Sequence, residues 1–275
     1  MSVCSVAIGF SQPIIQPVVA RYPALGAYSK NHVDIYSTSS NAAALAQLLQ
    51  PSISLYTERR FMVDQLNLYS VSIGIPTASG GFAAHVNYFG SGLFNQSQLS
   101  LGYGISLSEK VDVGAQFNYH SVSQGNGYGK ASSINAAIGA LFHLTEKIHV
   151  GINIYNPLRS KWSKVKDEKI PAQYTFGMGY EVSAKLFASA EIIKEEGLPA
   201  NVQVAIQYRF VKQFFARAGV ATSTSSYFGG LGFGLKTYRI DLVASYHPQL
   251  GVSPALLILF GFGKNRKNDN VHAVE

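Results

Sequence analysis

Alternation between apolar and polar residues over Leu99–His120 is the feature that most limits how this chain can fold. Apolar side chains recur at every second position from Leu99 to Leu107, with serine or glycine between them. After Glu109 and Lys110 the same rhythm resumes and runs to His120. Because neighbouring side chains in a strand point to opposite faces, each half predicts a strand with one apolar and one polar face.

Short charged turns of the same kind recur along the chain, at 143–151, 181–189, 209–217 and 235–243. Each lies between alternating runs of about ten residues, the length that a tilted strand needs to cross a bilayer. We therefore expect about fourteen antiparallel strands. Their expected ranges are 52–59, 65–76, 82–90, 96–108, 111–120, 132–144, 148–155, 172–182, 186–193, 201–210, 214–221, 227–236, 239–247 and 255–262.

Composition decides between a membrane barrel and a soluble sandwich of strands. Charged residues make up only 13% of the chain, and no run of 18 apolar residues is present, which excludes a helical membrane span. A soluble sandwich would expose its polar face, but here that face is rich in glycine, serine, asparagine and glutamine and poor in lysine and glutamate. Tyrosine and phenylalanine near the strand ends are typical of lipid-facing strands. These features favour an all-β transmembrane antiparallel β-barrel with a short N-terminal helical plug.

The chain divides into four segments. Residues 1–12 are interpreted as the remnant of a secretory signal peptide that lacks its basic start, and 13–51 as the plug. Within the plug, Asn41 or a preceding serine can cap a short helix that Pro51 ends. Residues 52–263 form the barrel, and 264–275 are expected to be a disordered periplasmic tail. Short and longer connections alternate, and because both termini lie on the side of the short turns, this pattern places the barrel in a bacterial outer membrane with periplasmic termini.

Two regions carry a family resemblance. The segment RYPALGAYSKNHVDIYSTSSNAAALAQL at 21–48 is similar to the opening segment of the FadL-type outer-membrane transport family, and 200–223 and 228–262 are similar to its closing hairpins. The chain resembles in particular the PorV/PorQ-like branch linked to type IX secretion. The resemblance implies a fourteen-stranded barrel with a plug whose motif residues are Asp34, Asn41, Ala42 and Ala43. The family has a proline where this chain has Ala42.

Two functions follow from the resemblance. The first is a type IX secretion-associated accessory, a monomeric barrel that binds secretion-system proteins through its loops. The alternative is a transporter of hydrophobic, fatty-acid-like small molecules, with a lateral opening near a strand kink at Gly90 and Gly92.

Glycines on the polar face suggest how the plug fits. We expect them to let the plug backbone approach the wall closely, which predicts a narrow and filled lumen. The positions are Gly102, Gly104, Gly139, Gly177, Gly179, Gly230, Gly232 and Gly234.

An enzyme is not expected. His85, His120, His143 and His149 fall on the predicted lumen face, without the spacing of a metal site, and no cofactor motif is present. His120 and Ser121 are adjacent and so point to opposite faces, which prevents a nucleophile–base pair. The net charge of +7 does not indicate nucleic-acid binding, because the basic residues lie in turns, one loop and the tail, without interleaved aromatics.

The loop at 156–171 is the most basic connection. We expect its cations to contact outer-membrane lipid, in particular lipopolysaccharide phosphates, with Trp162 at the membrane interface, or alternatively to be a solvated loop. The loop holds Arg159, Lys161, Lys164, Lys166 and Lys169, and the first four are the expected lipopolysaccharide contacts.

Overall fold

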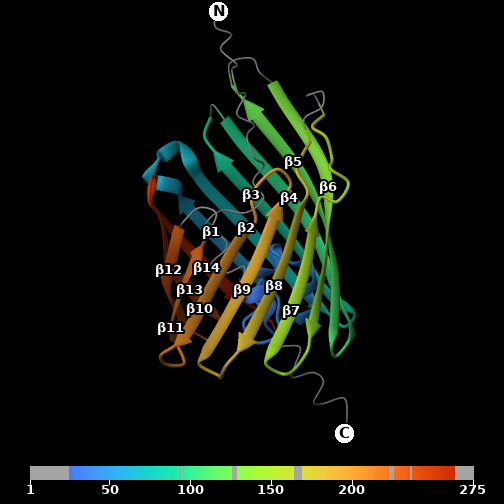
Figure 1. Ribbon diagram of the computed structural model, residues 1–275, viewed down its shortest axis with the longest axis vertical. Helices are drawn as coiled ribbons and strands as arrows, with labels where there is room; N and C mark the ends of the chain where they lie inside the picture. Colours follow the sequence, from blue (N-terminus) through green and yellow to red (C-terminus); the bar gives the residue numbers. More distant parts are fainter. Residues whose placement is uncertain are drawn as a thin grey trace, which may run out of the picture.

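Fourteen antiparallel strands close into a barrel in the computed structural model, which describes residues 25–92, 94–125, 129–163, 169–222, 226–235 and 237–263 (Figure 1). Each strand pairs with its neighbours in sequence, and β1 closes the ring against β14. The strands are β1 (Ser52–Arg59), β2 (Asn67–Thr77), β3 (Gly80–Gly90), β4 (Phe94–Ser108), β5 (Val111–Gln124), β6 (Gly129–His143), β7 (Ile148–Tyr155), β8 (Gln173–Glu181), β9 (Leu186–Glu195), β10 (Asn201–Arg209), β11 (Phe214–Ala221), β12 (Ser226–Gly234), β13 (Tyr238–His247) and β14 (Gly251–Gly261).

The barrel confirms the predicted fold class and excludes the two-sheet sandwich. In β8 every second residue is buried and the residues between are exposed, so that Tyr174 and Phe176 point outward while Thr175 points inward. The hairpin of β4 and β5 shows the same pattern, with the apolar Leu101 exposed and the polar Ser100 and Asn118 buried. The apolar face is therefore the outer face, and the polar face lines the lumen.

The lumen holds the N-terminal segment 25–50, called the plug below. It contains three short 3₁₀ helices, η1 (Leu25–Tyr28), η2 (Ser37–Ser39) and η3 (Ala42–Gln47), and Figure 1 shows it inside the barrel toward the end with the short turns. Asn41 caps η3 as predicted, its side chain accepting a hydrogen bond from the Ala43 N–H (3.0 Å). The helix ends at Gln47, before Pro51, and it is a 3₁₀ helix. Among the described residues, no helix is long and apolar enough to cross a membrane.

The wall is uneven in height, and this corrects the predicted pattern of loops. Strands β4, β5 and β6 contain 15, 14 and 15 residues, whereas β7 and β11 contain 8 each. The strands take up residues that the sequence assigned to long loops. Thus β3 and β4 are joined by a tight turn between Gly90 and Phe94, and β13 and β14 by another between His247 and Gly251. Two further 3₁₀ helices, η4 (Arg60–Met62) and η5 (Asp64–Leu66), join β1 to β2.

Candidate functional site

The plug is seated on glycines of the wall. A Cβ atom added at Gly104 would lie 2.5 Å from the Ala42 carbonyl oxygen, and one at Gly114 would lie 2.4 Å from the Ala43 nitrogen. At Gly139 the same atom would lie closest to the Asn41 side chain. Since contacts below 3.0 Å are essentially absent between real Cβ atoms and their neighbours, these positions admit the plug only because they have no side chain.

Not every glycine predicted to meet the plug does so. Gly177 and Gly179 lie beneath Tyr28, as predicted. Gly232 instead makes room for the Phe215 ring of the neighbouring strand, and Gly230 lies closest to Leu242 and Val243. The glycine seat also includes Gly74 on β2, which lies against Ile35 and Leu48, and Gly261 on β14, which lies against Gln50.

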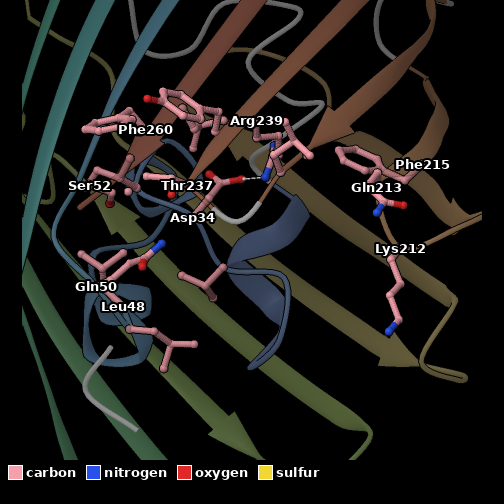
Figure 2. A pocket seen from close by; sticks show the side chains of 18 of the residues that line it. Asp34, Leu48, Gln50, Ser52, Lys212, Gln213, Phe215, Thr237, Arg239 and Phe260 are labelled. Atoms are coloured by element: carbon pink, nitrogen blue, oxygen red, sulfur yellow. Dashed lines mark hydrogen bonds and ion pairs between the residues drawn. The ribbon is translucent and has the colours of Figure 1, made fainter. Parts of the chain in front are cut away.

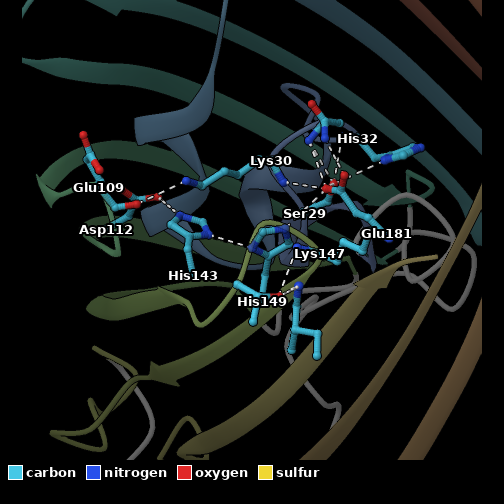
Figure 3. Close-up of polar contacts among 12 residues, drawn as sticks. Ser29, Lys30, His32, Glu109, Asp112, His143, Lys147, His149 and Glu181 are labelled. Atoms are coloured by element: carbon cyan, nitrogen blue, oxygen red, sulfur yellow. Dashed lines mark hydrogen bonds and ion pairs between the residues drawn. The ribbon is translucent and has the colours of Figure 1, made fainter. Parts of the chain in front are cut away.

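A buried polar chain ties the plug to the wall at the level of the short turns (Figure 3). His143 Nε2 lies 2.8 Å from Asp112 Oδ2, and the Nδ1 atoms of His143 and His149 lie 2.9 Å apart, so that they share one hydrogen. His149 Nε2 lies 3.4 Å from Glu181 Oε1. The four residues come from β5, β6, β7 and β8, and the sequence places each of them within a few positions of a short turn.

The plug binds both carboxylates at the ends of this polar chain. Gln47 donates to Asp112 Oδ2 (2.7 Å), and the Ser29 hydroxyl donates to Glu181 Oε1 (2.5 Å). The Asn31 side-chain amide donates to Glu181 as well. Hydrogen bonds to a carboxylate are among the stronger ones, so the chain of four acts as a clasp for the plug. Sequence reasoning placed both histidines in the lumen but did not predict that they meet.

His32 lies beside this clasp, stacked on the Phe187 ring with the ring centroids 4.8 Å apart. Burial, and then the charge of Arg217, lowers the pKa of His32 from 6.5 to about 4. Arg209 and Arg239 act in the same direction, and Glu181 acts against them. His32 is therefore neutral at physiological pH.

A second tie is an ion pair on the opposite wall. Arg239 Nη1 donates to Asp34 Oδ2 (2.8 Å), and Arg239 Nη2 donates to Asp241 Oδ2 (2.7 Å). Asp34 also accepts from the Ser37 N–H (2.8 Å), which fixes its side chain within the plug. All four predicted motif residues thus contact the wall or cap a helix: Asp34 pairs with Arg239, Asn41 caps η3, and Ala42 and Ala43 lie against Gly114.

Beside this ion pair lies a cavity of about 680 Å³, called the basal cavity below (Figure 2). It lies between the plug and the wall at the level of the short turns, and its lining mixes apolar, aromatic and basic side chains. The lining residues are Val33, Asp34, Ile35, Leu48, Leu49, Gln50, Ser52, Arg209, Lys212, Gln213, Phe215, Gly234, Leu235, Thr237, Tyr238, Arg239, Leu259, Phe260 and Gly261. The lumen is therefore less completely filled than the sequence predicted.

The predicted lateral opening is not at a strand kink. Gly90 and Gly92 lie in the turn between β3 and β4, where the Ser91 N–H donates to the Phe94 carbonyl oxygen (2.8 Å). The two strands pair without a shift in register from Gly81 to Gly90. The left-handed backbone of Gly90 (φ 104°) serves this turn, which is why glycine stands there.

Trp162 in the basic loop does not lie where the sequence predicted. Trp162 is buried, with its ring centroid 6.4 Å from that of His120 and packed with Tyr155 and Ile170, so it closes the barrel mouth and does not lie at a membrane interface. Arg159 pairs with Glu196 (3.0 Å). Lys161 lies in the same loop, and Lys164 and Lys166 lie outside the described residues, as do segments 1–12 and 264–275. Contact of this loop with lipopolysaccharide stays a prediction.

His120 belongs to a buried polar cluster in the lumen. His120 bonds to the Tyr155 hydroxyl (2.7 Å) and lies within hydrogen-bond distance of Asn135 (3.2 Å). Among the described residues, no group of three or more His, Cys, Asp or Glu side chains is arranged to hold a metal ion. The polar groups hold the plug by hydrogen bonds and an ion pair, and the basal cavity has the volume of a small-molecule pocket.

Comparison with known proteins identifies the fold. No protein-family profile matches the chain, and no curated protein sequence matches it. Among solved structures, the toluene transporter TbuX of Ralstonia pickettii is similar with a TM-score of 0.67 at 15% identity, over 84% of this chain and 94% of that one. The monoaromatic hydrocarbon channel CymD is similar with a TM-score of 0.62 at 14% identity, over the same shares. A FadL homologue of Pseudomonas aeruginosa has a TM-score of 0.58 at 12% identity, again over 84% and 94%. The chain thus has the fold of FadL-type bacterial outer-membrane channels.

Proposed function

We propose that this protein is an outer-membrane channel for small hydrophobic molecules, which the plug keeps closed until a molecule passes. The observation that carries the proposal is the plug itself, seated in a fourteen-stranded barrel by close glycine contacts and two polar ties. A barrel of this size without a plug would leave an aqueous opening, since eight strands already suffice for a lumen filled by side chains.

The basal cavity supports the same proposal. Its volume falls in the range of small-molecule pockets, and apolar side chains such as Leu48, Leu259 and Phe215 contribute to its lining. The structural neighbours are described as channels for toluene and monoaromatic hydrocarbons, which favours passage of small molecules over a role as secretion accessory. Neither a PorV/PorQ-like identity nor a type IX role draws support from the features described above.

The proposal is tested by uptake in cells, because toluene crosses a simple phospholipid bilayer unaided. We would express the protein in a Gram-negative host that lacks its own hydrophobic-compound channels and measure uptake of radiolabelled toluene. Folding in the outer membrane is checked by heat-modifiable migration on gels. We expect faster uptake than with the empty vector. Equal uptake with folded protein present would refute the proposal.

Deletion of residues 25–50 provides a second measurement of what the plug does. We expect the deleted barrel to admit a large polar antibiotic such as vancomycin, which the full chain excludes. If the deleted barrel is folded and still excludes vancomycin, the plug is not what closes the lumen.

A further inference from the structure

The lining of the basal cavity has an uneven charge. It contains three basic residues, Arg209, Lys212 and Arg239, against one acidic residue, Asp34. Arg239 is already satisfied, since Asp34 holds its Nη1 and Asp241 holds its Nε (2.9 Å) and Nη2. The other two cations come from the end of β10 and the turn that follows it.

Arg209 and Lys212 have no anionic partner among the residues that the structure describes. Within the described part of the chain, neither side chain makes a hydrogen bond or an ion pair, although both line the cavity. Arg209 is partly buried and Lys212 is exposed. Unpaired cations beside apolar surface attract a ligand that carries an anionic group on an apolar body, and an arginine fork matches a carboxylate in particular.

An inward-facing aromatic ring lines the same cavity. The Phe215 ring lies there with the guanidinium carbons of Arg217 and Arg239 at 5.2 and 5.3 Å from its centroid. Tyr238 and Phe260 also border the cavity, but they pair with each other on the outward-facing side of β13 and β14, so Phe215 supplies the inward-facing ring. Figure 2 shows Lys212, Gln213 and Phe215 together on one side of the Asp34–Arg239 pair, and Phe260 on the other. The Phe215 ring favours an aromatic body through offset or edge-to-face contacts.

From these observations we infer that the basal cavity is a binding site for compact aromatic monocarboxylates, with Arg209 and Lys212 holding the carboxylate and Phe215 contacting the ring. The inference rests on the proposed function in that such a molecule would be one of those that pass through the barrel. Such a site differs from one for neutral hydrocarbons because it requires a negative charge on the ligand. The cavity lies at the end of the barrel with the short turns, so binding there would retain a molecule as it leaves the plug region.

The test compares an acid with its neutral analogue. 4-(4-Fluorophenyl)butyrate and 4-(4-fluorophenyl)butanol are titrated with the full-length protein in neutral-detergent micelles and followed by ¹⁹F NMR, and the signal from protein-free micelles is subtracted. We expect the acid to bind at least about tenfold more tightly than the alcohol, and its affinity to fall with added salt, because both cations are reached by solvent.

Two double variants make the test specific. R209Q/K212Q removes both unpaired cations, and we expect it to weaken binding of the acid about tenfold and to leave the alcohol unchanged. K110Q/K147Q removes the same charge from other short turns at the same end of the barrel, and it should bind the acid like the wild type. Heat-modifiable migration establishes that each variant is folded.

The outcomes separate this inference from the proposed function. If acid and alcohol bind equally, or if R209Q/K212Q binds the acid like the wild type, or if the folded wild type binds no acid, the inference is wrong. Toluene uptake measured alongside then still decides the channel function by itself. Charge-dependent binding of the acid without any toluene uptake would instead support the site and contradict the channel.

Discussion

Replacing Gly114 by alanine tests the idea that missing side chains hold the plug in place. The new Cβ atom would lie 2.4 Å from the carbonyl carbon of Ala42 and from the nitrogen of Ala43, whereas ordinary contact begins at 3.4 Å. The difference, 3.4 − 2.4, is 1.0 Å, and both contacted atoms belong to the backbone. Neither can rotate away, so the plug itself has to shift by about 1 Å.

The energetic consequence follows from what such overpacking costs. Inserting one methyl group into a well-packed interior destabilises it by about 1–3 kcal/mol. Since about 1.4 kcal/mol is a factor of ten in an equilibrium constant, the undocked plug should become roughly 5- to 150-fold more populated. Hydrogen exchange of the peptides within 25–50, in the intact barrel, measures that population, and vancomycin sensitivity of expressing cells reports its effect on closure.

The matched control is Gly229→Ala, because at Gly229 the nearest atom to an added Cβ is the Arg217 carbonyl oxygen at 3.5 Å, an ordinary contact. We expect this control to behave like the wild type. In a barrel that lacks residues 25–50, Gly114→Ala should be as heat-stable as its parent. If Gly114→Ala leaves hydrogen exchange of the plug unchanged, the close contacts do not seat the plug and the reasoning fails.

Three further predictions concern the ties and the mouth of the barrel. Arg239→Met should release the plug more than Asp34→Asn, because Arg239→Met leaves two carboxylates without their shared cation, whereas Asp34→Asn leaves Arg239 paired with Asp241. The rate at which a protease cleaves the plug compares the two variants, and faster cleavage in Asp34→Asn would contradict the pairing. Trp162 is the only tryptophan, so the fluorescence of the protein reports on it alone. Because the side chain is buried, its emission should be blue-shifted and poorly quenched both by acrylamide and by brominated lipid, and strong quenching by the lipid would instead show that Trp162 lies at the membrane interface. Docking of the plug should weaken as the pH falls from about 7 toward 4, because the pKa of His32 is 6.5 in the undocked plug and about 4 in the docked one. His32→Gln should reduce this pH dependence of protease access to the plug, and an unchanged pH profile would show that His32 is not its source.

The strands could be read from the sequence because their pattern is local. A half-apolar strand in a barrel must alternate at every residue, and the ranges of β1, β7 and β11 are those expected from the alternation alone. The ends of β5 and β6 were less predictable. Beyond His120 the apolar alternation weakens, yet the backbone ladder continues to the pair Gln124–Gly129, since hydrogen bonds between strands do not require apolar side chains.

The ties between plug and wall could not be read from the sequence because they join residues far apart in it. Asp34 and Arg239 are 205 positions apart, and whether they meet depends on how deep the plug sits. A weak signal existed for the clasp, since Asp112, His143 and Glu181 are ionisable residues on the polar face close to short turns, which places them at one level of the barrel. Nothing in the alternation indicates that Trp162 turns inward, because it lies in a loop.

The difference in strand length gives the molecule a front and a back within the plane of the membrane. At about 3.4 Å per residue and a tilt of about 40°, fifteen residues rise roughly 39 Å and eight rise roughly 21 Å, against an apolar band of about 25 Å. The flank formed by β4–β6 would thus extend above the lipid headgroups, while the opposite rim at β11 would end near their level. In the proposed channel, a molecule that moves along the membrane surface would meet a barrier on one side and an open rim on the other.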